Sequence, residues 1–175
     1  MERQFEEASS GSPGRILPDP KEAPIAVAAA LWNELCSHAL EAAPEECCGL
    51  VGGAPDEPFR SVYRCRNDMT KHHLADAEQF PRDGQTAFFM NETDYLRAMQ
   101  QAEERGEQIR AVYHSHVGAG AYFSELDQAF ATQAWFPFPD AHHVVISLLD
   151  GRVADLAAFR RAPRGFMGRR MVPRP

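Results

Sequence analysis

The chain has 175 residues, of which 44% are hydrophobic and 25% are charged, values typical of a single globular domain with an apolar core. No apolar stretch approaches the ~20 residues of a membrane-spanning helix, and the charged first 24 residues lack the apolar centre of a secretory signal. The net charge of -7 argues against general nucleic-acid binding.

The first half of the chain is expected to contain one helix and one β-hairpin. Residues 1–24 are rich in proline, glycine and serine, which predicts a disordered leader. Alanine and leucine spacing over residues 25–43 predicts an amphipathic helix. The apolar run 47–53 and the alternating run 59–65 predict two paired strands. The polar segment 67–85 is interpreted as a long loop.

The second half is expected to alternate strands and helices and to end in a hairpin. Asp150-Gly151 is a strong signal for a two-residue hairpin turn. The expected elements, in chain order, are a short strand (86–90), a helix (92–105), a strand (109–116), a helix (124–134) and two further strands (143–149 and 152–160).

This mixed order predicts an α/β (mixed α+β) fold in a single domain over residues 25–160. Six arginines and no acidic residue fall within residues 160–175. We therefore expect residues 161–175 to form a basic C-terminal tail, either solvated and folded back on the acidic domain or in contact with an acidic partner.

The four cysteines have no spacing typical of a disulfide framework or of a cysteine zinc site, because none forms a C-x-x-C pair. Reduced thiols and a cytoplasmic location are therefore expected, with neither a membrane nor a nucleic acid as partner. The cysteines are Cys36, Cys47, Cys48 and Cys65.

The most informative residues are two histidines on a predicted strand and an aspartate on the helix that follows. His114 and His116 are two positions apart, so in a strand both imidazoles point to one face. Ser124 stands at a predicted helix start and Asp127 three residues later, which is the pattern of a capping box. That pattern also holds the Asp127 carboxylate at the helix start, where it can face the histidines.

Two imidazoles and one carboxylate make a three-ligand site suited to zinc, with the fourth position open to water. Such a site needs a base, and the candidates are Glu45, Glu46 and Glu125. Glu46 is favoured because it opens an apolar strand, where partial burial raises a carboxyl pKa. Ser124 is placed to donate its hydroxyl to a carbonyl oxygen on which negative charge develops.

Together these residues resemble the JAMM motif of the MPN+ or JAB metalloprotease family. The motif residues are His114-Ser115-His116, the Ser124 and Asp127 that follow, and the preceding Glu46-Cys47-Cys48-Gly49. The resemblance extends over about residues 25–160. The family usually has a proline after the second histidine, whereas this chain has Val117.

The resemblance implies a cytidine-deaminase-like domain with a mixed sheet flanked by helices. It implies one zinc ion held by His114, His116 and Asp127, with Glu46 activating the zinc-bound water and Ser124 assisting the carbonyl. The implied activity is hydrolysis of the amide bond after the C-terminal glycine of a ubiquitin-like or sulfur-carrier β-grasp protein, by deconjugation or C-terminal processing. Tyr122 and Phe123, next to Ser124, are expected to line the cleft.

Two other functions stay open from the sequence. One is a metallopeptidase that acts on a small peptide or amide with the same site, because loops decide substrate choice. The other is a non-catalytic scaffold module of the same fold, which has no need to keep all five site residues together.

Overall fold

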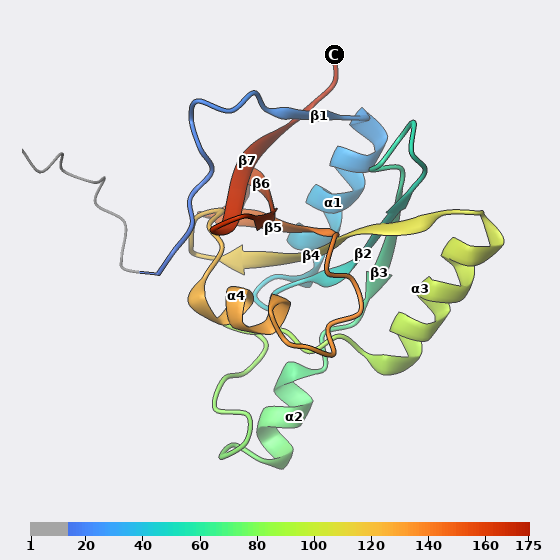
Figure 1. Ribbon diagram of the computed structural model, residues 1–175. Coiled ribbons are helices and arrows are strands. Elements are labelled where there is room, and N and C mark those ends of the chain that lie inside the picture. The colour runs from blue at the N-terminus through green and yellow to red at the C-terminus, as the bar shows by residue number, and fades with distance from the viewer. Residues whose placement is uncertain (1–13) are drawn as a thin grey trace, which may run out of the picture.

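The computed structural model describes residues 14–175 (Figure 1). Within them, seven strands form one sheet in the order β1-β7-β6-β5-β4-β2-β3. No helix among these residues is long and apolar enough to cross a membrane. The elements are β1 (Ile25–Val27), α1 (Ala29–Ala42), β2 (Cys48–Gly53), β3 (Ser61–Cys65), α2 (Met69–Ala75), α3 (Glu92–Glu104), β4 (Gln108–Val117), α4 (Glu125–Ala131), β5 (His142–Leu149), β6 (Arg152–Ala162) and β7 (Gly165–Pro173).

The sheet is mixed, which confirms the predicted fold class. β4 pairs with β5 in parallel and β1 pairs with β7 in parallel, while the other neighbours are antiparallel. The predicted hairpin between β5 and β6 is confirmed. Asp150 and Gly151 have φ angles of 51° and 72°, the two positive values that a type I′ turn requires.

Helices cover both faces of the sheet, and alternate strand residues point to each of them. On one face α1 buries Leu35 and Ala39 against Tyr113 and Ile146. On the other, α3 packs Ala98 and Ala102 against a group that includes Leu50 and Val112. The helix α4 lies near the end of β4, and α2 lies farther from the sheet (Figure 1). The double coverage explains why the middle of β5 is apolar without alternation.

The expectation of a basic tail over residues 161–175 is wrong, because most of this segment is strand β7. It pairs with β6 on one side and with β1 on the other. Met171 is 1% exposed and anchors the strand in the core. Arg170, by contrast, reaches Asp155 on β6. Arg174, just after β7, likewise pairs with Glu57.

The leader prediction also differs from the structure over residues 14–24, which we call the strap. Its Ile16 forms an antiparallel bridge with Phe123, and its Pro18 forms a parallel bridge with Gly168. The rest of the expected leader, residues 1–13, lies outside the described residues. The strap is ordered because it pairs with segments that are distant in the sequence. Its proline-rich composition gives no sign of these pairings.

Two further predictions need correction within the first half of the chain. The segment expected as a loop over residues 67–85 contains the two-turn helix α2. It begins where the Asn67 carboxamide oxygen accepts a hydrogen bond from the Met69 amide at 3.0 Å. The short strand expected over residues 86–90 is reduced to one bridge, between Asn67 and Met90.

Candidate active site

The two histidines lie side by side near the carboxyl end of β4. His114 is 3% exposed and His116 8% exposed. Ser115, between them, points to the opposite face, where its Oγ accepts a hydrogen bond from the Cys47 amide at 2.8 Å. The strand alternation that aims the imidazoles at one point therefore also ties β4 to the start of β2.

Asp127 comes from the first turn of α4, and the predicted capping box is present. The Ser124 Oγ accepts from the Asp127 amide at 3.1 Å, and the Asp127 Oδ2 accepts from the Ser124 amide at 3.0 Å. These reciprocal bonds hold the carboxylate against the helix start. Because Ser124 uses its oxygen as the acceptor, its hydroxyl proton stays free for another partner.

The three side chains converge closely enough to hold one metal ion. The Nε2 atoms of His114 and His116 are 3.1 Å apart, and they lie 3.4 and 3.6 Å from the two oxygens of Asp127. Tetrahedral zinc bonds of about 2.0–2.1 Å would separate neighbouring ligand atoms by roughly 3.3 Å. This donor set therefore fits zinc in both chemistry and spacing.

The surroundings fix the orientation of both imidazoles. The Nδ1 of His116 lies 2.9 Å from the carbonyl oxygen of Gly120, so Nδ1 carries the proton and Nε2 keeps its lone pair for a metal. The ring of His114 stacks on Phe88 with the ring centroids 4.7 Å apart. Burial alone would raise the pKa of Asp127, but the two histidines and Ser124 hold it well below its usual range.

Glu46 lies two residues before the start of β2 and lines the same cleft as Asp127. It is 6% exposed, and burial, with a smaller contribution from the nearby Asp127 carboxylate, raises its pKa to about 9. The charge state of a buried carboxyl group of this kind responds strongly to any nearby positive charge. Glu46 therefore has the environment of a proton-transfer residue.

Asn67 fixes the backbone around Glu46, a role that the sequence analysis missed. Its Nδ2 donates to the Glu46 carbonyl at 3.0 Å and to the Ala87 carbonyl at 3.1 Å. Its Oδ1 accepts from the Phe89 amide at 2.9 Å. The Glu46 amide in turn donates to the Gly84 carbonyl at 2.7 Å. A lone asparagine after a strand carries no local signal of such a role.

The other two candidate bases are placed differently. Glu45 accepts a hydrogen bond from the Thr70 hydroxyl at 2.5 Å, so its carboxylate supports the neighbouring loop. Glu125 is exposed on the first turn of α4 and does not line the cleft. The geometry therefore singles out Glu46.

A cleft of about 680 Å³ opens beside these residues. Glu46, His116, Ser124 and Asp127 all lie along it. Residues 79–82 of the segment 67–85 and Tyr122 also contribute to its lining. Its apolar wall is formed by Met69, Phe80, Phe88, Leu126 and Phe130.

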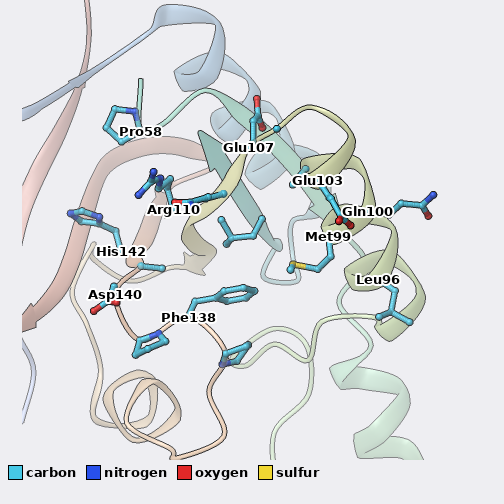
Figure 2. A pocket seen from close by; sticks show the side chains of 17 residues that line it. Pro58, Leu96, Met99, Gln100, Glu103, Glu107, Arg110, Phe138, Asp140 and His142 are labelled. Carbon is cyan, nitrogen blue, oxygen red and sulfur yellow. The ribbon is translucent and has the colours of Figure 1, made fainter. Parts of the chain in front are cut away.

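A larger hollow of about 960 Å³ lies at the other end of β4 and contains none of the predicted site residues. Arg110 and His142 lie on one side of this hollow and Met99 of α3 on the other (Figure 2). Its size therefore does not mark the chemistry, which lies in the smaller cleft.

The structure separates the two residues expected to line the cleft. Tyr122 lies in the cleft lining, with its ring centroid 4.8 Å from that of His116. Phe123 is fully buried and stacks on Phe159 in the core. The expectation for Phe123 is therefore wrong, because neighbouring side chains of an extended segment point in opposite directions.

Comparison with known proteins matches residues 28–162 to the prokaryotic homologs of the JAB domain. The chain belongs to this family. The matched segment contains all five predicted site residues, but it excludes the strap and strand β7.

Relatives of this JAB-domain chain include the CysO-cysteine peptidases of Mycobacterium bovis and Mycobacterium tuberculosis. Each is 28% identical over 138 residues, which cover 78% of this chain and 82% of the relative. A solution structure from Salinibacter ruber is 26% identical with a TM-score of 0.57, and one from Desulfitobacterium hafniense is 22% identical with a TM-score of 0.62. Both alignments cover 86% of this chain and 92% of the other.

Proposed function

We propose that this chain is a zinc-dependent peptidase that hydrolyses the amide bond after the C-terminal glycine of a ubiquitin-like or sulfur-carrier β-grasp protein. The observation that carries the proposal is the convergence of three metal-ligand side chains with a buried glutamate in one cleft. His114, His116 and Asp127 would hold the ion, and Glu46 lies beside them.

A zinc ion in this position supplies Lewis acidity and lowers the pKa of water to ~7. The remaining work belongs to side chains of the protein. Glu46 takes a proton from the attacking water and delivers it to the leaving nitrogen, a role that its buried carboxyl suits. Ser124 donates its free hydroxyl proton to the carbonyl oxygen as negative charge develops there.

The shape of the cleft and the relatives support a glycine-ended tail as substrate. Glycine residues have no side chain, so a Gly-Gly tail can lie extended in a narrow cleft close to the metal ligands. A volume of about 680 Å³ suits a peptide segment and not a folded domain. The relatives named CysO-cysteine peptidase favour a sulfur-carrier protein as the partner that presents this tail.

The alternatives make different predictions for one experiment. The zinc-loaded protein is incubated with an intact β-grasp protein whose Gly-Gly tail carries an extra residue, and with a linear peptide of the same tail sequence. Mass spectrometry then locates any cleavage. We expect the intact protein to be cut after its terminal glycine with the higher kcat/KM. Equal cleavage of both would favour a small-peptide enzyme, and no cleavage of either would favour a scaffold module.

A further inference from the structure

The cleft contains one cationic side chain, Arg82, whose charge is not used by the protein itself. The other ionisable side chains that line the cleft are His116 and the carboxyl groups of Glu46 and Asp127. Arg82 is exposed and forms no ion pair with any carboxylate in residues 14–175. Its neighbour Asp83 instead accepts a hydrogen bond from the Gln85 amide at 2.9 Å.

Arg82 is held in place by anchors on both sides, although it lies outside helices and strands. On one side the Phe80 carbonyl oxygen is 2.7 Å from the Nδ1 of His73. On the other side the Gly84 amide donates to the Thr70 hydroxyl at 2.9 Å, and the Gly84 carbonyl accepts from the Glu46 amide at 2.7 Å. The backbone of Arg82 is therefore tied to the backbone of Glu46.

The Arg82 guanidinium and the Glu46 carboxyl group line the same cleft without pairing with each other. The Gly84 carbonyl that accepts from the Glu46 amide at 2.7 Å is only two residues from Arg82 in the chain. The two groups thus lie near each other, with no direct ion pair between them. An anion of the substrate that approaches Glu46 would meet an unpaired guanidinium.

The position of Glu46 decides which part of a substrate lies beside Arg82. Hydrolysis breaks the C–N bond of the amide, the water oxygen bonds to the glycine carbonyl carbon, and a proton goes to the leaving nitrogen. Because Glu46 delivers that proton, a cation beside Glu46 lies on the leaving-group side. In an α-linked residue the carbon next to the leaving nitrogen carries the α-carboxylate. In an isopeptide the leaving nitrogen ends a lysine side chain, whose α-carbon is four methylenes away.

We propose that Arg82 binds the free α-carboxylate of a single amino acid joined to the C-terminal glycine of the tail, so that the enzyme releases one amino acid and not a folded conjugate. Arginine suits this role because its planar guanidinium pairs with a carboxylate through two parallel hydrogen bonds. This inference rests on the proposed function and names the leaving group of that reaction.

The test compares two substrates that differ only at the carboxylate. One is a β-grasp protein ending in Gly-Gly plus one residue with a free carboxylate, and the other is the same protein with a C-terminal amide. For the zinc-loaded wild type we expect at least tenfold higher kcat/KM on the free carboxylate, chiefly through KM. Arg82→Gln should abolish this preference by lowering kcat/KM on the free-carboxylate substrate to about the value on the amide, while Arg82→Lys should retain part of the preference.

Arg152→Gln is the matched control, since Arg152 is exposed at the start of β6, and it should keep the full preference. An equal loss on both substrates in Arg82→Gln, or no preference in the wild type, would overturn the role of Arg82 alone. Faster cleavage of a lysine isopeptide than of the free-carboxylate substrate would overturn it in favour of deconjugation. Failure of the wild type to cut any of the three would refute the proposed function as well.

Discussion

Ile16 and Phe123 exchange both of their backbone hydrogen bonds, at 3.0 and 2.9 Å, although they are far apart in the chain. Phe123 directly precedes Ser124, so the strap is joined to the residue that caps α4 and orients Asp127. The Nε2 of Gln128 adds a second link, because it donates to the carbonyls of Gly14 at 2.6 Å and Phe123 at 3.2 Å. The strap thus supports the site from outside the segment that the JAB-domain family covers.

A first prediction concerns Gln128. Gln128→Ala removes the side-chain links to the strap and to Phe123, each worth about 0.5–1.5 kcal/mol. If half of that free energy is added to the activation barrier, because Ser124 and Asp127 are misplaced, kcat should fall about fivefold. Circular dichroism should change little. Gln133→Ala, at an exposed residue just after α4, serves as control. A full wild-type rate in Gln128→Ala would show that the strap does not support catalysis.

A second prediction concerns the proton-transfer residue. Glu46→Gln keeps the size of the side chain but cannot carry a proton between water and the leaving nitrogen. We expect kcat to fall by about 100-fold or more, with the zinc content of the purified protein unchanged. Glu125→Gln, which changes a candidate base outside the cleft, should retain the wild-type rate. If Glu46→Gln stayed active and Glu125→Gln did not, the assignment of the base would be wrong.

A third prediction concerns the metal. His116→Ala removes one of three ligands, so zinc measured by atomic absorption should drop well below one ion per chain. Zinc should also raise the melting temperature of the chelator-treated wild type, because a ligand that binds only the folded state stabilises it. That shift should largely vanish in His116→Ala and persist in His142→Ala, a histidine of β5 in the other hollow. Full zinc occupancy in His116→Ala would contradict the ligand set.

A fourth prediction concerns stability below neutral pH. The Nδ1 of His38 lies 2.7 Å from the Tyr113 hydroxyl, and burial, with help from Arg64, lowers the pKa of His38 to about 4. In the unfolded chain that pKa is about 6.5, so between these values the unfolded state binds more protons. The contribution of His38 to the free energy of unfolding is therefore complete above pH 6.5 and is lost as the pH falls towards 4.

The loss should amount to about 1–2 kcal/mol, once solvent screening around a partly exposed ring is allowed for. Urea denaturation at pH 7 and pH 4.5 measures it for the wild type and for His38→Gln. Glutamine can still accept the Tyr113 hydroxyl proton but does not titrate. The variant should therefore lose less stability than the wild type on acidification. An identical loss in both proteins would remove His38 as the cause.

Much of the candidate site was predictable because its geometry is local. His114 and His116 share a face through the two-residue repeat of a strand, and Ser124 and Asp127 meet within one helical turn. The same kind of reasoning placed the Asp150-Gly151 turn correctly. It could not distinguish Tyr122 from Phe123, because the orientation of an irregular segment depends on what packs against it.

The sequence by itself determined the mixed α/β class, the convergence of both imidazoles and the start of α4, since each depends on residues a few positions apart. Only the tertiary structure decided that an arginine-rich end is strand β7, that the strap pairs with Phe123, and that Asn67 supports Glu46. Those outcomes depend on backbone hydrogen bonds and buried contacts between remote segments. The composition of a segment does not predict such pairings, because the partner of a strand depends on residues that are remote in the sequence.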